Sequence, residues 1–273
     1  MASDAHAHPH ELMLRFPGAE AERRRLGISC AASAWNGGEF AAHEEMAAAA
    51  NREEEAPLFL CFAVHPQLPA AQGRTAGSIK PYRDELDLLA ALAAEGRLAA
   101  VGETGFDLFN KTFRETEAVQ DELFAAHLET AFCRSLPLVI HARRAMHKIF
   151  YYTKVLAALP AVVFHSWPGA PDEGFSLLRR GVNAFFSFGT TIMLNHKNAI
   201  RSCAAFPPDR LLLETDAPWQ PLRGAFFSQW QDLAAITRAA AAIRKETGGV
   251  GGEPEVLERI TDENFFRVYK SAG

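Results

Sequence analysis

Histidine and carboxylate side chains stand where several short apolar runs of this sequence end. The first run ends in the order His6-Ala7-His8, and later runs end in a single histidine or acidic residue. These later positions are His65, Glu103, His141, His165 and Asp216. Imidazoles and carboxylates are the ligands that divalent metal ions use in proteins. The residue types therefore predict a metal centre, provided that the fold brings the positions together.

The apolar runs predict β-strands, because they are short, bounded by polar or turn residues, and in several cases continuously apolar, as in parallel strands buried on both faces. We expect strands at Ala2–His8, Leu26–Ser33, Leu58–His65, Leu98–Gly105, Leu136–His141, Ala161–Ser166, Val182–Phe188 and Arg210–Asp216. Segments rich in Ala, Leu, Glu and Arg predict helices between them, at Glu39–Glu54, Tyr82–Glu95, Glu115–Ser135, Ala145–Leu159, Asp172–Arg180, Leu194–Phe206 and Ser228–Glu246.

This alternation indicates repeated βαβ units and an α/β fold. Eight strands, each followed by a helix, match a (β/α)8 TIM barrel better than an open doubly wound sheet, and the usual glycine-rich dinucleotide fingerprint is missing after the first strand. The glycine-rich stretch 247–254 predicts a loop before a last helix at Glu255–Tyr269. We therefore expect residues 1–273 to form a single domain.

In such a barrel the active site lies at the C-terminal ends of the strands. Residues two apart on a strand point to the same face, so His6 and His8 can both project toward the barrel axis. Each position alone has an ordinary alternative: the two histidines as surface residues, Glu103 as a solvated strand end, Asp216 as a helix cap. Burying all of these groups around one barrel mouth is costly without a metal or pairing, and six ligands suit two ions.

The composition excludes other classes of protein. Of the 273 residues 48% are hydrophobic and 22% charged, which excludes wholesale disorder and a fibrous protein. The net charge of −5 excludes a protein that holds nucleic acid mainly by bulk positive charge, but not an enzyme with a locally positive cleft. No C-x-x-C pair, secretory signal or membrane span is evident, so we expect a cytoplasmic protein that does not enter the membrane, and no stable protein partner is implied.

Eight segments carry a family resemblance in their order along the chain. They are Asp4-Ala-His6-Ala-His8, Val64-His65-Pro66, Gly102-Glu103-Thr-Gly105-Phe-Asp107, Gln120…Phe124, Pro137-Leu-Val-Ile-His141-Ala-Arg143, His165-Ser-Trp-Pro-Gly169, Glu214-Thr-Asp216-Ala-Pro218 and Asn264-Phe265. Together they resemble the TatD family of metal-dependent hydrolases, within the amidohydrolase-like barrels. The resemblance implies a (β/α)8 fold, a two-metal centre and phosphodiester hydrolysis. It also implies two groups of ligands bridged by Glu103: His6, His8 and Asp216 for one ion, and His141 and His165 for the other.

The resemblance further implies roles in catalysis. Two ions about 3.5–4 Å apart would share a water molecule, lower its pKa and present hydroxide to phosphorus. We expect Asp216 to act as the general base and His65 to lie near the scissile phosphate. Arg143 is a candidate phosphate clamp, with a solvent-facing arginine at a helix start as an equal alternative. Glu214 and Asp107 are expected to orient the ligands.

Loops at the rim of the site depart from the family pattern. Gln67 follows Pro66 where a histidine is common, and no Asn-Glu-Pro follows Arg223-Gly224. The metal centre is therefore expected to be intact, while the preference for DNA is less firmly implied. Four aromatic residues could stack bases or simply pack: Phe109, Trp167, Trp219 and Phe226.

The function expected is that of a divalent-metal-dependent hydrolase of phosphodiester bonds, a TatD-like deoxyribonuclease that binds DNA or another phosphodiester transiently. Its cofactors would be two divalent ions, Mg, Mn or Zn. One alternative is an amidohydrolase acting on a small amide or ester, which is disfavoured because Glu103 ends the fourth strand with no lysine nearby to be carboxylated. The other alternative is a non-catalytic metal-binding barrel, which is disfavoured because all six proposed ligands are present.

Overall fold

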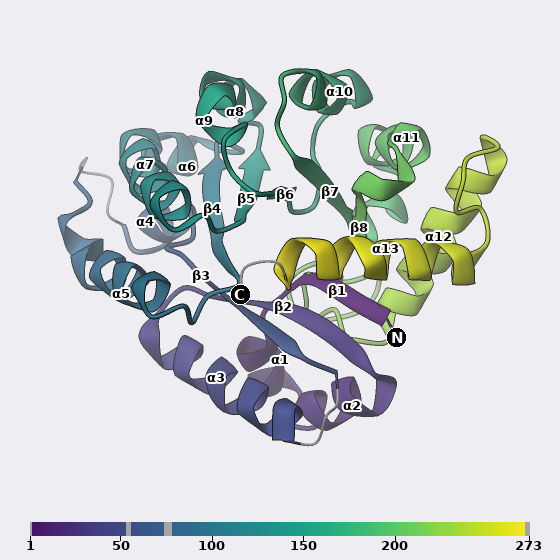
Figure 1. The fold of residues 1–273 in the computed structure, drawn as a ribbon, viewed down its shortest axis with the longest axis horizontal. Helices are drawn as coiled ribbons and strands as arrows, with labels where there is room; N and C mark the ends of the chain where they lie inside the picture. Colours follow the sequence, from purple (N-terminus) through teal and green to yellow (C-terminus); the bar gives the residue numbers. More distant parts are fainter. Residues whose placement is uncertain (1, 53–55, 74–77, 271–273) are drawn as a thin grey trace.

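The computed structural model describes residues 2–52, 56–73 and 78–270. Within them, eight parallel strands run in chain order, each paired with the next (Figure 1). They are β1 (Ala2–Ala7), β2 (Ile28–Ala34), β3 (Leu58–Phe62), β4 (Ala100–Asp107), β5 (Leu138–Arg143), β6 (Val162–Phe164), β7 (Ala184–Phe188) and β8 (Leu211–Leu213). With helices alternating between the strands, this is the predicted (β/α)8 TIM barrel, and the fold class is confirmed.

Backbone hydrogen bonds hold the first and last strands together at their C-terminal ends, where β1 ends and the segment after β8 begins. The Asp216 N–H donates to the His6 carbonyl oxygen at 3.0 Å, and the His8 N–H donates to the carbonyl oxygen of Ala217 at 2.8 Å. Closure of the barrel at this end therefore places predicted ligands from the two ends of the chain side by side.

Thirteen α-helices are found among the described residues. They are α1 (Pro9–Arg15), α2 (Ala19–Leu26), α3 (Gly37–Arg52), α4 (Leu68–Ala71), α5 (Arg83–Ala94), α6 (Lys111–Arg114), α7 (Glu117–Arg134), α8 (Met146–Tyr151), α9 (Thr153–Leu156), α10 (Pro171–Arg179), α11 (Lys197–Ala205), α12 (Asp232–Glu246) and α13 (Pro254–Tyr269). Short 3₁₀ turns lie at Lys80–Tyr82, Thr190–Ile192 and Pro208–Arg210.

Several boundaries differ from the sequence prediction. Helices α1 and α2 were not predicted, because they are short and α2, with five charged residues among its eight, shows little apolar pattern. The helix expected at Ala145–Leu159 is divided into α8 and α9 at Tyr152. Strand β3 ends at Phe62, so His65 lies on the following loop. The expected helix end at Glu54 lies outside the described residues.

Two apolar layers hold the barrel together. The inner layer takes one residue from each strand and closes on α13 through Phe265, Val268 and Tyr269. The Tyr269 hydroxyl donates to the Ala5 carbonyl oxygen, and the Asn264 amide donates to the backbone of Leu211 where β8 begins. Helix α13 therefore covers the end of the barrel opposite the predicted ligands.

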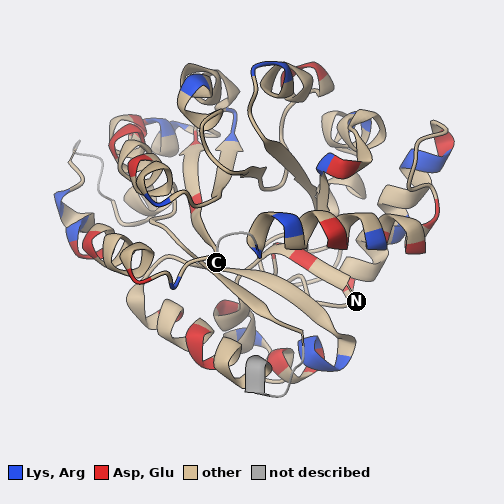
Figure 2. Ribbon diagram, viewed as in Figure 1, with Lys and Arg blue, Asp and Glu red and all other residues tan. Residues whose placement is uncertain are grey.

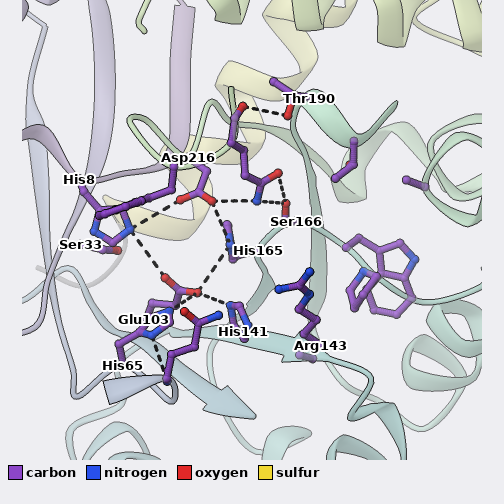
Figure 3. A pocket seen from close by; sticks show the side chains of 18 of the residues that line it. His8, Ser33, His65, Glu103, His141, Arg143, His165, Ser166, Thr190 and Asp216 are labelled. Atoms are coloured by element: carbon purple, nitrogen blue, oxygen red, sulfur yellow. Dashed lines mark hydrogen bonds and ion pairs between the residues drawn. The ribbon is translucent and has the colours of Figure 1, made fainter. Parts of the chain in front are cut away.

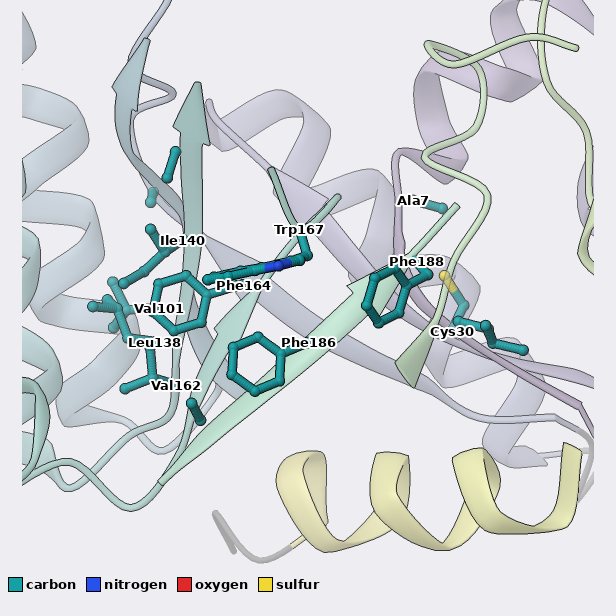
Figure 4. Packing of buried hydrophobic residues seen from close by; sticks show 14 of the residues in the cluster. Ala7, Cys30, Val101, Leu138, Ile140, Val162, Phe164, Trp167, Phe186 and Phe188 are labelled. Carbon is teal, nitrogen blue, oxygen red and sulfur yellow. The ribbon is translucent and has the colours of Figure 1, made fainter. Parts of the chain in front are cut away.

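The outer layer packs the strands against the surrounding helices. It includes Phe164 of β6, Phe186 of β7 and Trp167, whose rings contact one another (Figure 4). Charged residues of both signs are interspersed on the helices and loops (Figure 2). Among the helices that the structure describes, none is long and apolar enough to cross a membrane.

Candidate metal centre

Five of the six predicted ligands line one cavity of about 1120 Å³ at the C-terminal ends of the strands, and the sixth, His6, is buried beside Glu103 and Asp216. Side chains from β4, β5 and the segments after β1, β6 and β8 point toward one another there (Figure 3). All six predicted ligands except His141 are buried. The barrel therefore assembles residues that are far apart in the sequence into one buried polar cluster.

The carboxylate of Glu103 lies between two sets of histidines. Its Oε2 is 3.0 Å from His6 Nε2 and 3.8 Å from His8 Nε2. Its Oε1 is 2.7 Å from His141 Nδ1 and 3.6 Å from His165 Nε2. Oε2 of Glu103 thus faces His6 and His8, while Oε1 faces His141 and His165 and also lies 3.3 Å from His65 Nε2. The carboxylate therefore lies between two groups of imidazoles, as a bridging ligand would.

Asp216 completes the first set. Its Oδ1 lies 3.7 Å from His6 Nε2 and 3.6 Å from His8 Nε2, while its Oδ2 lies 3.8 Å from His165 Nε2. The ligand atoms of His6, His8 and Asp216 are all within 4.8 Å of one another, as are those of His6, Glu103 and His165. His141 and His165 both face Glu103, but their ring centroids are 5.9 Å apart.

A glycine allows Glu103 and His141 to lie side by side. Gly105 on β4 pairs with His141 on β5, and its φ of 135° is one that residues with side chains rarely adopt. A Cβ atom at this position would lie 2.1 Å from the carbonyl oxygen of His141. The close approach of these two strands, and of the side chains they carry, therefore depends on glycine.

The backbone is also unusual at two residues that follow strands. Asp216 has a φ of 52° and Ser166 a φ of 44°, both in the left-handed region. Non-glycine residues seldom adopt this conformation, and it is enriched at functional sites. After this turn, the Asp216 carboxylate lies beside His6 at the end of β1 and His8 just after it.

Buried groups behind the histidines hold three of the rings in place. Asp107 Oδ2 lies 3.2 Å from His141 Nε2, and Glu214 Oε1 lies 2.8 Å from His165 Nδ1. The Ser33 hydroxyl lies 3.2 Å from His6 Nδ1. Such outer partners fix the orientation of metal-ligating histidines, and Asp107 and Glu214 lie in contact with His141 and His165.

The electrostatics favour positive charge between Glu103 and Asp216. Burial alone would raise the pKa of Glu103, but the surrounding histidines, His65 and His165 foremost, hold it well below its usual range. Burial raises the pKa of Asp216 well above its usual range, and the nearby charge of Glu103 adds to this effect. Burial would lower the pKa of His141, yet its hydrogen bonds to Asp107 and Glu103 raise it to about 10.

The donor set fits divalent metal ions. The buried Nε2 of His6 has no hydrogen-bond partner among the described residues, although oxygens of Glu103 and Asp216 lie beside it. This imidazole nitrogen faces two carboxylate oxygens but forms no hydrogen bond. It therefore has the position expected of a ligand that shares a cation with those carboxylates. Imidazole and carboxylate groups together suit Zn, Mn, Fe or Ni, and the carboxylates also suit Mg.

His65 differs from the other histidines. Its Nε2 lies 3.3 Å from Glu103 Oε1, while its Nδ1 accepts the backbone N–H of Gln67 at 3.2 Å. Since Nδ1 is an acceptor, the proton of the neutral ring is assigned to Nε2, which makes this nitrogen a donor toward the cavity. The side chain is 21% exposed, so the residue stands at the edge of the cluster.

Arg143 lies on the rim of the cavity, and the four aromatic candidates differ in exposure. The Arg143 side chain is 48% exposed and lines the cavity, with its Nη1 4.0 Å from Asp107 Oδ2. Phe109, Trp219 and Phe226 are exposed, but Trp167 is 1% exposed and packs in the core, where its Nε1–H donates to Ser202. Stacking of a base on Trp167 is therefore ruled out.

Three further polar residues of the site were not predicted. Asp4 is buried and accepts the backbone N–H and the hydroxyl of Thr215, which ties β1 to the segment that carries Asp216. The Gln220 amide donates to Asp216 Oδ2 at 2.8 Å, and the Gln67 amide donates to Asp107 at 2.6 Å. Asp4 is two residues before His6, and this spacing is the one signal in the sequence that could have singled it out.

Comparison with known proteins gives consistent matches. A family model described as TatD related DNase matches residues 3–270. A relative from Dickeya dadantii, named 3'-5' ssDNA/RNA exonuclease TatD, is 34% identical over 218 residues, which cover 75% of this chain and 79% of the relative. An Escherichia coli K12 protein named uncharacterized metal-dependent hydrolase YcfH is 30% identical and covers 69% of this chain and 68% of its own length.

Solved structures share the fold. The crystal structure of YJJV, a TatD homologue from Escherichia coli K12, has a TM-score of 0.78 at 21% identity and covers 98% of both chains. An uncharacterized amidohydrolase from Saccharomyces cerevisiae has a TM-score of 0.74 at 14% identity, covering 98% of this chain and 100% of its own. The family match over nearly the whole chain shows more than the fold: this protein belongs to the TatD-related DNase family.

Proposed function

We propose that this protein is a divalent-metal-dependent nuclease that shortens single-stranded DNA or RNA from the 3' end. The observation that carries the proposal is the position of Glu103, whose Oε2 faces His6 and His8 while its Oε1 faces a second group of histidines that includes His141 and His165. The name of the Dickeya dadantii relative supports the substrate and polarity. One inner layer shared by all eight strands supports a single domain over residues 1–273.

Two ions, Mg, Mn or Zn, are the proposed cofactors, with Glu103 between them. The first would be held by His6, His8 and Asp216, and the second by His141 and His165. When bound, such ions lower the pKa of a water molecule and neutralise charge on the phosphoryl oxygens.

The remaining steps belong to side chains of this protein. Asp216 accepts the proton of the attacking water at a carboxylate oxygen, a role that its place beside the histidines supports. His65 directs Nε2–H at a phosphoryl oxygen and stabilises the charge that develops there. Arg143, exposed at the rim, binds a phosphate of the strand.

The test is cleavage of a single-stranded oligonucleotide labelled at its 5' end. The purified protein is assayed with Mg, Mn or Zn, with chelator, and as the Glu103→Gln variant. We expect the labelled strand to be shortened only when metal is present. The rate of shortening should be about 100-fold or more lower in the variant. Glu129→Gln, an exposed residue of α7, is the matched control and is expected to retain full activity.

Two outcomes would contradict the proposal. Cleavage that persists in chelator, or in Glu103→Gln at the wild-type rate, would remove the metal centre from the reaction. A metal-loaded, folded protein that leaves every oligonucleotide intact but hydrolyses a small amide or ester would instead indicate the amidohydrolase alternative.

A further inference from the structure

A second cavity, of about 510 Å³, adjoins the metal centre. Its lining includes Phe109 and two consecutive arginines, Arg143 and Arg144. Arg143 lines this cavity and the larger one, as do Pro168 and His196. A chain that leaves the metal centre past Arg143 would therefore enter the second cavity directly.

Both arginines are held against one aromatic ring. The guanidinium carbon of Arg143 lies 3.7 Å from the centroid of the Phe109 ring, and that of Arg144 lies 4.7 Å from it. Arg144 also donates from Nη1 to the carbonyl oxygen of Phe109 at 3.3 Å. A cation–π contact orients a guanidinium without neutralising its charge.

The backbone supports this arrangement. Arg144 follows β5 directly and has a φ of 55°, a left-handed conformation that a bulky residue seldom adopts. Consecutive residues of an extended strand point to opposite faces. The turn at Arg144 instead allows both guanidinium groups to reach the same ring.

The charge of the two arginines is little compensated. Within the described part of the chain, Arg144 forms no ion pair, and the one carboxylate near Arg143 is that of Asp107 at 4.0 Å. Glu173 also lines the cavity, but its Oε2 already accepts the backbone N–H of Ala170 at 2.7 Å. In a protein with a net charge of −5, this is a local site for anions beside the metal centre.

We propose that Phe109, Arg143 and Arg144 form a subsite for the phosphates of the nucleic-acid strand next to the one that is cleaved. This inference rests on the proposed function and extends it. Arg143 contacts the phosphate nearest the metal centre, and Arg144 contacts one further along the strand. Longer strands would then bind more tightly than a dinucleotide.

The test compares Arg144→Gln with wild type on a dinucleotide and on a dodecanucleotide. The ratio of kcat/KM for the longer to that for the shorter substrate is expected to fall about tenfold, mainly through KM. The slope of log KM against log salt for the dodecanucleotide should decrease by about 0.7, the value for one lost phosphate contact. Arg238→Gln, an exposed arginine of α12 that lines neither cavity, is the control and should change neither quantity.

The outcomes separate the two proposals. If wild type cleaves both substrates and Arg144→Gln has the wild-type ratio and salt slope, the subsite is wrong while the nuclease function stands. If wild type cleaves neither substrate with any metal, the proposed function itself fails.

A different observation concerns the ring of His8. Ser33, Asp107 and Glu214 contact the rings of His6, His141 and His165 from behind, but His8 has no such partner among the described residues. The buried Nδ1 of His8 has no hydrogen-bond partner among the described residues, and the same is true of the buried Oε1 of Glu39. His8 and Glu39 belong to one cluster with Glu11, in which the ligand atoms lie within 4.8 Å of one another.

Glu39 is the buried acidic residue of this cluster, and its Oε1 has no hydrogen-bond partner among the described residues. It lies in the first turn of α3, is 3% exposed, and uses Oε2 to accept the Trp35 N–H at 3.1 Å. Glu11, by contrast, is only half-buried, and its Oε2 accepts the indole N–H of Trp219 at 2.5 Å. We infer that Glu39 Oε1 accepts the Nδ1–H of His8 and is a positioning residue that turns His8 Nε2 toward Glu103 and Asp216.

A measurement of Mn affinity tests this second inference independently of catalytic activity. Glu39→Gln is expected to bind one of two Mn ions about 10- to 100-fold more weakly in equilibrium dialysis, as when an outer partner is lost. Its melting temperature in chelator should equal or exceed that of wild type, which excludes misfolding as the cause. Glu45→Gln, exposed on the same helix, should bind as wild type does. Wild-type affinity in Glu39→Gln would overturn the inference.

Discussion

Glu214 supports His165 from behind. Its Oε1 lies 2.8 Å from His165 Nδ1 and accepts the backbone N–H of Ser166, also at 2.8 Å. Both side chains are almost completely buried. Burial alone would raise the pKa of Glu214, but the adjacent His165 lowers it, so the carboxylate stays charged. This contact leaves Nε2 of His165 facing Glu103 and Asp216.

Glu214→Gln should therefore weaken metal binding. The variant loses the charge that fixes and polarises His165, so the affinity for one ion is expected to fall about 10- to 100-fold. Isothermal titration with Mn measures this, with Glu255→Gln, exposed at the start of α13, as the control. Unchanged affinity in Glu214→Gln would show that the contact does not support a ligand.

Gly105→Ala should destabilise the barrel at the site. The added methyl group would lie 2.1 Å from the carbonyl oxygen of His141, so β4 and β5 would have to separate. We expect a loss of about 3 kcal/mol or more from overpacking and backbone strain together, read from urea denaturation. Gly96→Ala has a positive φ of 67° but nothing within 4 Å of the new atom, and should cost about 1–2 kcal/mol. Equal losses in the two variants would contradict this explanation.

His127 predicts a dependence of stability on pH. It is fully buried, its Nε2 accepts the Val64 N–H at 3.0 Å, and its Nδ1 lies 2.9 Å from the Thr104 hydroxyl. Burial lowers its pKa from 6.5 to about 4. The unfolded chain therefore binds more protons between these two values, so stability is retained above pH 6.5 and falls as the pH drops toward 4.

The expected loss from this residue is on the order of 2 kcal/mol between pH 7 and pH 5. His127→Gln cannot titrate, so its free energy of unfolding should depend less steeply on pH over this range. Chemical denaturation of both proteins in chelator at several pH values gives the comparison. Parallel curves would show that His127 is not a source of acid sensitivity.

The sequence predicted the parts of this structure that depend on local pattern. The eight apolar runs correspond to eight strands, because burial on both faces leaves a continuous apolar signal in several of them and turn or polar residues bound them all. The six proposed ligands came together because parallel strands in a barrel share one C-terminal end. Strand ends were less well predicted, and His65 lies three residues beyond β3.

The parts that sequence alone missed depend on contacts between distant segments. Ser33 reaches His6 because β2 pairs with β1, and Gln220 reaches Asp216 because the chain turns after β8. Neither residue lies in a motif that suggests chemistry. Trp167 lies two residues after His165, in a loop that also suits substrate contact. Its ring nevertheless turns into the core and packs against Phe186. Which way such a side chain points is decided by the space that the fold leaves open.

The most direct test of the account is a reactivation titration. The protein is freed of metal by chelation, Mn is added stepwise, and bound metal per chain is measured beside cleavage of a single-stranded oligonucleotide. We predict that two ions bind, that activity rises fully only with the second, and that Glu103→Gln remains inactive while folded. Full activity in the metal-free protein, or an equally active Glu103→Gln, would contradict the proposal that Glu103 bridges a catalytic pair of metal ions.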